Sequence, residues 1–175
     1  VFLLQGALIM FVSLPLLGVN ATTNSNELNW LDYLGMLVFI IGFVFEAGGD
    51  FQLARFKKDP KNKGKLLNTG FWKFTRHPNY FAEWMVWNGL VIAAIPSWLA
   101  LYSAESLIIW VLLGVGLLMV SYGLFATLVS YTGAVPSEYY SVQKRPGYKA
   151  YQLQTNQFFP GPRKTTLDVN SDPAG

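Results

Sequence analysis

The fold is decided by residues 107–130, LIIWVLLGVGLLMVSYGLFATLVS, a run that contains no charged residue. An α-helix needs roughly 20 apolar residues to cross the hydrocarbon core of a bilayer. Three further runs are similar: residues 1–19 and 84–104 carry no charge, and residues 28–47 carry acidic residues only near their ends. Because backbone groups in lipid must be paired within the protein, we predict that all four runs are transmembrane helices.

The composition agrees with a membrane protein. Of the 175 residues, 52% are hydrophobic and 13% are charged, and the mean hydropathy is +0.30. A soluble domain of this size would need far more charge to cover its surface. The chain has no cysteine and one histidine, so cysteine chemistry is excluded and no metal site is expected. The predicted fold class is therefore an all-α integral membrane helix bundle.

The basic residues predict how the bundle is oriented. All 13 Lys and Arg lie within residues 55–76 or residues 144–164, and two predicted helices separate these segments, so both face the same side of the membrane. The positive-inside rule makes that side cytoplasmic, or its matrix or stromal equivalent. We expect a multi-pass protein of the endoplasmic reticulum or an organellar membrane if eukaryotic, or of the inner membrane if bacterial.

The two ends of the chain are expected to differ from the bundle. Residues 137–151 have tyrosines at helical spacings and an Arg-Pro-Gly interruption, which predicts two short interfacial helices with aromatic side chains at headgroup level. Residues 163–175 are polar and predict a flexible tail. The chain starts with valine inside an apolar run, so we expect residues 1–162 to be a transmembrane domain that lacks preceding N-terminal helices.

The start of the third predicted helix carries an unusual set of polar groups. Residues 70–84, GFWKFTRHPNYFAEW, hold two basic residues and the only histidine directly before an apolar segment. Pro78 suits the first helical turn, where a missing N–H costs nothing. A helix N-terminus favours anions, and Arg76 and Lys73 add positive charge beside it. The pattern predicts a site for a phosphate or another anion.

Carboxylates close to the membrane form a second set of candidates. Glu46 and Asp50 are four residues apart and share a helix face. Charged groups at this depth are costly unless they pair with cations or bind a ligand. Glu83 is interpreted either as a complement to the helix dipole or as a ligand contact. An ion pair such as Asp50 with Arg55 is the structural alternative. The lysine-rich residues 57–65 are interpreted either as a solvated loop that sets topology or as a contact for anionic headgroups.

These residues also carry a resemblance to a known family. The relevant stretches are DFQLARFKKDPKNKGKLLNTGFWKFTRHPNYFAEW (50–84), TGAVPSEYYSVQKRPGYKAYQLQTNQFFPGP (132–162), VSLPL (12–16) and GFVFEAGGD (42–50). They resemble the DUF1295 group of the steroid 5-alpha-reductase-like membrane proteins. The most specific part is HPNYFAE with DPKNKG upstream of it.

The resemblance implies a membrane reductase with a cytoplasm-facing NADPH pocket. Its reaction would transfer a hydride to an activated carbon–carbon double bond in a steroid or other lipid-like enone. The residues that polarise the carbonyl are expected on helices ahead of the matched region, so catalytic residues stay unknown. The cofactor-binding residues implied by the resemblance are Glu46, Asp50, Arg55, Lys57, Lys65, Arg76, His77, Asn79, Tyr80, Glu83 and Tyr140.

Two other functions stay open. One is a non-catalytic accessory subunit of a larger membrane complex. The other is an enzyme similar to the isoprenylcysteine methyltransferases, which use S-adenosylmethionine; the lysine-rich loop favours a phosphate-bearing cofactor over this one. The expected partners are the lipid bilayer, a lipid-like substrate and, for the accessory subunit, other subunits. Nucleic acid is not expected, because the basic residues lie at membrane boundaries and the net charge is only +3.

Overall fold

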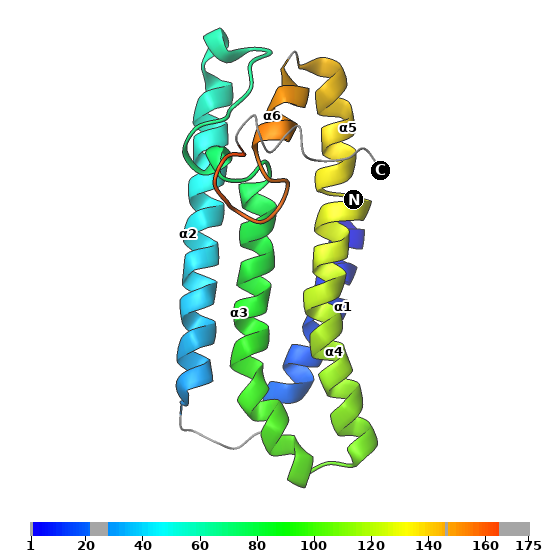
Figure 1. The fold of residues 1–175 in the computed structure, drawn as a ribbon. Helices are drawn as coiled ribbons and strands as arrows, with labels where there is room; N and C mark the ends of the chain where they lie inside the picture. Colours follow the sequence, from blue (N-terminus) through cyan, green and yellow to red (C-terminus); the bar gives the residue numbers. More distant parts are fainter. Residues whose placement is uncertain (1, 22–27, 146, 165–175) are drawn as a thin grey trace. The chain divides into compact units, whose positions relative to one another are not determined.

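The computed structural model describes residues 2–21, 28–145 and 147–164, and these residues are helical with connecting turns (Figure 1). The helices are α1 (Phe2–Ala21), α2 (Trp30–Lys58), α3 (Pro78–Ala100), α4 (Leu107–Ala126), α5 (Ala134–Lys144) and α6 (Tyr148–Gln154). A five-residue π-helical turn, Thr127–Tyr131, follows α4. The all-α fold class is confirmed, and α5 and α6 form where the two short helices were predicted.

Among the described residues, three helical stretches are long and apolar enough to cross a membrane: Trp30–Lys58, Pro78–Ser103 and Leu107–Lys144. Between 11% and 17% of their most apolar windows is buried, so most of these side chains face outward, as in lipid-exposed helices. The chain is therefore an integral, multi-pass membrane protein. The fourth predicted run corresponds to α1, a helix of 20 residues. The predicted tail lies outside the described residues from residue 165 onward.

The chain divides into two compact units. The first unit comprises Val1–Ile41 and Trp84–Phe125, and the second comprises Gly42–Glu83 and Ala126–Gly175. The core of the first unit consists of apolar side chains from α1, α3 and α4 and the turn after α3: Leu16, Val19, Ala94, Leu101 and Leu117. The candidate functional site lies entirely within the second unit.

Two tryptophans close the turn between α3 and α4 in the first unit. The indole of Trp98 donates to the backbone carbonyl of Trp110 at 2.9 Å, and that of Trp110 donates to the carbonyl of Trp98 at 2.9 Å. Their rings stack with centroids 4.4 Å apart. Pro96 lies inside α3, which continues to Ala100. Bundle helices tolerate such prolines because neighbours satisfy the freed backbone groups.

Two glycines bring α2 and α3 into backbone contact in the first unit. A Cβ added to Gly35 would lie 2.5 Å from the carbonyl oxygen of Gly89, and one added to Gly89 would lie 2.7 Å from the backbone nitrogen of Phe39. Small residues allow membrane helices to approach this closely. Any larger side chain at these positions would have to push two backbones apart.

We expect Gly89→Leu to destabilise the first unit by about 1–3 kcal/mol, the usual cost of overpacking. Thermal unfolding of the detergent-solubilised protein would measure this loss. The matched control is Gly123→Leu, since a Cβ on Gly123 meets no atom within 4 Å. Equal unfolding midpoints for the two variants would contradict the close contact.

Candidate functional site

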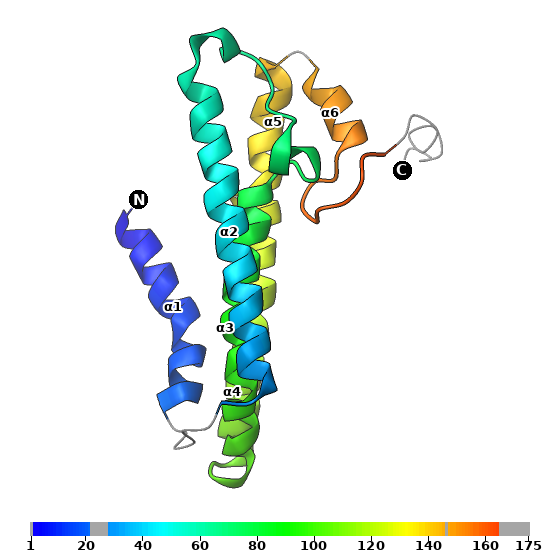
Figure 2. The same ribbon diagram turned by 90° about the vertical axis from the view of Figure 1, so that its left-hand side faces the viewer.

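The second unit is built around the loop that joins α2 to α3. Its residue Thr75 is fully buried. The Thr75 hydroxyl lies 3.0 Å from the carbonyl of Gln157 and 2.9 Å from that of Phe158, and the backbone N–H of Gly161 donates to the carbonyl of Phe74 at 3.0 Å. Figures 1 and 2 show the segment after α6 beside this loop. The segment that follows α6 therefore holds the loop in place through these hydrogen bonds.

A buried ion network lies next to this contact. Arg76 Nε donates to Glu138 Oε1 at 2.7 Å and Arg76 Nη2 to Glu138 Oε2 at 3.1 Å. His77 Nε2 is 2.9 Å from Glu138 Oε1, and Gln152 Nε2 donates to Glu138 Oε2 at 2.7 Å. Arg76 Nη1 also donates to the backbone carbonyls of Gln152 and Thr155. The network joins the loop before α3 to α5, α6 and the residue after α6.

The hydrogen bonds of Arg76 to protein acceptors determine whether its guanidinium is available to a ligand. Burying an arginine and a carboxylate is tolerable only when both charges are paired and their hydrogen-bonding groups are satisfied. Arg76 is 8% exposed and directs its bonds to protein acceptors on both sides. The prediction that Arg76 and His77 lie around a cofactor's phosphates stays a prediction, and Glu138 already supplies both with a negative partner.

A cavity of about 490 Å³ lies beside the network, within the size range of small-molecule sites. One group of lining residues is charged. Its cations are Lys57, Lys58, Lys63, Lys65, Arg76 and Arg145, and Asp59 adds a carboxylate. The four lysines are exposed, so they can move toward a ligand. Among the described residues, the ion pairs are those of Glu138. The lysines could therefore bind a phosphate-bearing ligand without breaking an existing ion pair.

A second group of lining residues is uncharged at neutral pH. It includes Asn79, Tyr80, Ser141 and Tyr148. The Oδ1 atom of Asn79 is buried and lacks a hydrogen-bond partner among the described residues. An unsatisfied buried acceptor is costly, and at a cavity wall it is suited to a ligand's N–H or O–H donor. Asn79 is thus the strongest single indication of a ligand at this site.

Burial also affects the phenols near the cavity. Desolvation raises the pKa of Tyr148 to about 12, and the charge of Glu138 adds to the increase. Desolvation likewise raises the pKa of Tyr151, whose hydroxyl donates to the carbonyl of Trp72. Both phenols therefore stay protonated at neutral pH, and Tyr148 can act as a hydrogen-bond donor at the cavity wall.

The structure brings six of the predicted site residues to the cavity: Lys57, Lys65, Arg76, His77, Asn79 and Tyr80. The other five are not among its lining residues. Arg55 lines a separate hollow of about 430 Å³, and Tyr140 is exposed with the ammonium group of Lys144 5.9 Å from its ring centre. Glu46, Asp50 and Glu83 are close enough to influence one another electrostatically. The alternative Asp50–Arg55 ion pair does not form in the described residues.

Sequence reasoning missed Glu138 and did not indicate that two tyrosines would be buried. The expectation that Tyr148 and Tyr151 lie at headgroup level stays a prediction. In the structure they are 4% and 5% exposed, and the Tyr151 hydroxyl donates to the carbonyl of Trp72 in the loop before α3. A signal for Glu138 was present: it is the only acidic residue between Glu105 and Asp168, a stretch that also holds Lys144, Arg145 and Lys149. Such a lone carboxylate among cations is a candidate for an ion pair.

The fold and site define a multi-pass membrane protein with a polar, cation-lined cavity in one helical unit. Residues 1–155 match the family described as "Protein of unknown function (DUF1295)", and the chain belongs to this family. This match confirms the resemblance noted from the sequence. No solved structure matches the chain.

Three relatives extend the comparison. The chain is 29% identical to the uncharacterized protein C594.04c of Schizosaccharomyces pombe over 163 residues, 82% of this chain and 43% of the relative. It is 39% identical over 60 residues to the probable O-methyltransferase ustE of Ustilaginoidea virens, 34% of this chain and 21% of the relative. It is 38% identical over 60 residues to a Delta(14)-sterol reductase of Arabidopsis thaliana, 29% of this chain and 16% of the relative. The chain thus spans less than half the length of each relative.

Proposed function

We propose that this chain provides the NADPH-binding part of a membrane-embedded reductase that acts on an activated carbon–carbon double bond in a steroid or other lipid-like enone. The cavity of the second unit carries this proposal, because it combines mobile cations with an unsatisfied buried acceptor. The partial similarity to a sterol reductase supports the same class of reaction. The positive-inside rule supports a position of the cavity on the cytoplasmic side or its organellar equivalent.

The residues at the cavity fit the chemical groups of NADPH. Lys57, Lys58, Lys63 and Lys65 can neutralise phosphates through charge-assisted hydrogen bonds. Asn79 Oδ1 can accept a hydrogen bond from an amide or hydroxyl of the ligand. Asp50 and Glu83, which do not line the cavity, are proposed acceptors for ribose hydroxyls or the carboxamide, and Glu46 stays a predicted cofactor-binding residue. When bound, NADPH supplies the hydride, whereas the protein binds and orients the ligand.

Asn79→Ala tests the proposal at its most specific residue. Loss of one ligand hydrogen bond is expected to weaken NADPH binding about 5- to 30-fold, corresponding to about 1–2 kcal/mol. The unfolding midpoint should not fall, because the variant removes an unpaired buried acceptor. Fluorescence titration of NADPH on the purified full-length protein measures the first effect and thermal unfolding the second.

A matched asparagine provides the control. Asn88 lies on α3 in the first unit, where it accepts from the hydroxyl of Ser121 at 2.7 Å and donates to the carbonyl of Trp84 at 2.6 Å. Asn88→Ala should therefore lower stability and leave NADPH affinity unchanged. Unchanged affinity in both Asn79→Ala and Glu83→Gln would rule out this site assignment.

A methyltransferase is the second candidate, favoured by the partial similarity to a probable O-methyltransferase. Its cofactor, S-adenosylmethionine, has no phosphate and would make little use of the lysines at the cavity. The two candidates therefore differ in their response to lysine substitution. A protein that binds S-adenosylmethionine with an affinity insensitive to Lys57→Gln and Lys65→Gln would support the methyltransferase.

A further inference from the structure

Glu138 is the centre of the buried network in the second unit. Its side chain is 6% exposed, and each of its oxygens receives two donors. Oε1 faces Arg76 Nε and His77 Nε2, whereas Oε2 accepts from Arg76 Nη2 and Gln152 Nε2. The carboxylate thus holds side chains from the loop before α3 and from α6 against α5.

The contacts of His77 extend this hold to the cavity wall. His77 precedes Pro78, the first residue of α3, and Asn79 and Tyr80 follow directly. The imidazole stacks on the Tyr80 ring with centroids 5.2 Å apart and planes 2° from parallel. Since Asn79 and Tyr80 both line the cavity, a displacement of His77 would move the uncharged part of its wall.

The same carboxylate also sets the charge of the wall. Arg76 and His77 line the cavity as well, and Glu138 provides a local negative charge for both. Without it, the Arg76 guanidinium would be buried and unpaired, and it would have to turn toward water or a ligand. Glu138 therefore holds the Arg76 guanidinium within the cavity wall, and a bound anion would contact the exposed lysines instead.

We infer that Glu138 is a positioning residue for the cofactor cavity: by its charge it fixes Arg76 and His77, and through them the first turn of α3. This inference rests on the proposed function, and it identifies the residue that fixes the positions of side chains in the cavity wall. Glu138 does not line the cavity. It acts only through Arg76 and His77.

Comparing two substitutions separates a charge-based role from simple packing. Glu138→Asp keeps the negative charge and loses one methylene, whereas Glu138→Gln keeps the size and loses the charge. We expect NADPH affinity at least about 10-fold weaker in Glu138→Gln and within about threefold of wild type in Glu138→Asp, because hydrogen bonds to charged groups are the stronger ones. A role in packing alone predicts the reverse order, since the isosteric amide would then be tolerated better.

The experiment is a fluorescence titration of NADPH on the full-length protein, with unfolding midpoints recorded for each variant. Glu105→Gln, in the turn between α3 and α4, is the matched control and should bind as wild type does. Affinity of Glu138→Gln within twofold of wild type, or better than that of Glu138→Asp, would overturn the inference while leaving the proposed function intact. A wild-type protein that fails to bind NADPH would overturn both.

A milder variant keeps the test decisive if Glu138→Gln does not fold. Gln152→Met removes one of the four donors to Glu138 and leaves the contacts of Arg76 and His77 with Glu138 in place. We expect a two- to fivefold loss of NADPH affinity from this variant. Gln152 does not line the cavity, so the loss would have to act through Glu138. Unchanged affinity in a folded Gln152→Met protein would contradict the positioning role.

Discussion

Replacing Arg76 with methionine is expected to lower the free energy of unfolding by roughly 3–5 kcal/mol, the typical cost of removing one partner from a buried ion pair. The substitution would leave the Glu138 carboxylate buried with His77 and Gln152 as its remaining donors. It would also remove the donor to the carbonyl of Thr155. Thermal or denaturant unfolding in detergent, followed by tryptophan fluorescence, measures the effect.

A second arginine in the same unit serves as the control. Arg163 is exposed, and its guanidinium donates one hydrogen bond, to the carbonyl of Asn68 at 2.8 Å. Arg163→Met should therefore change stability by less than about 1 kcal/mol. If Arg76→Met and Arg163→Met shifted the unfolding transition equally, the buried Arg76–Glu138 network would not contribute more to the stability of the second unit than an exposed arginine does.

The double variant Lys57→Gln/Lys65→Gln is expected to weaken NADPH binding about 30-fold or more at low salt. Each lysine can form a charge-assisted bond to a phosphate, and two such bonds together account for a loss of this size. Because exposed charges are screened, the difference from wild type should shrink as salt is raised. Titrations of NADPH at two salt concentrations measure both effects.

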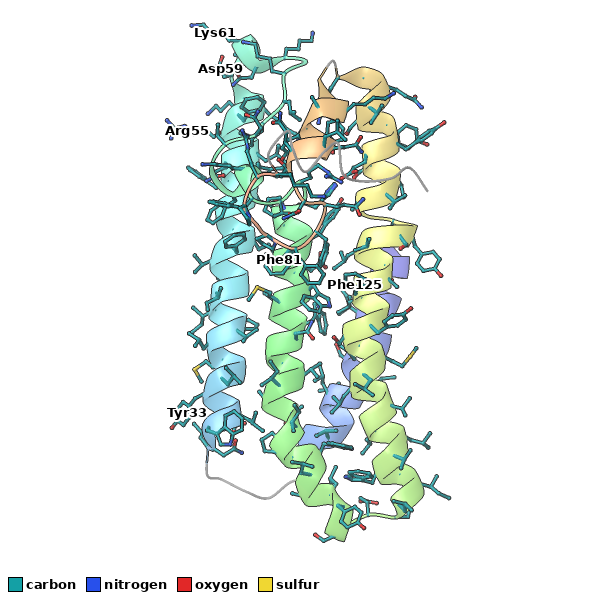
Figure 3. All side chains as sticks on the ribbon, viewed as in Figure 1. Tyr33, Arg55, Asp59, Lys61, Phe81 and Phe125 are labelled. Atoms are coloured by element: carbon teal, nitrogen blue, oxygen red, sulfur yellow. The ribbon has the colours of Figure 1, made fainter. Side chains whose placement is uncertain are left out.

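The lysine-rich loop offers its own control. Lys61 belongs to the same segment and carries the same charge, but it does not line the cavity, and Figure 3 shows it at the far end of the loop beside Asp59. Lys73 does not line the cavity either. Lys61→Gln/Lys73→Gln should therefore lose little affinity. An equal loss in both double variants would mean that the loop attracts anions only through its total charge.

Much of the fold follows from local patterns in the sequence. Uncharged runs predicted the apolar helices, and Pro78 at a polar boundary predicted the first residue of α3. The end of α2 was predicted less well: its apolar run stops near Ala47, but the helix continues to Lys58. Arg and Lys are good helix formers and are favourable in a last turn, so the loss of hydropathy did not end the helix.

The candidate site was only partly predictable because its main contacts join distant parts of the chain. Lys57, Lys65 and Asn79 were found from charge and motif. The Arg76–Glu138 pair spans 62 residues, and no periodicity in one segment indicates which carboxylate another segment will bind. For the same reason the tyrosine spacing predicted a helix but not that the Tyr151 hydroxyl would donate to the carbonyl of Trp72.

Binding of NADPH to the cavity of the second unit is tested most directly by equilibrium binding to the purified full-length protein in lipid nanodiscs. NADPH, NADH and S-adenosylmethionine would be titrated in parallel on wild type and on Lys57→Gln/Lys65→Gln. We expect saturable NADPH binding, at least about 10-fold weaker NADH binding because the 2′-phosphate contact is lost, and sensitivity of NADPH binding to the lysine substitutions. Saturable binding of S-adenosylmethionine without binding of NADPH would contradict this expectation.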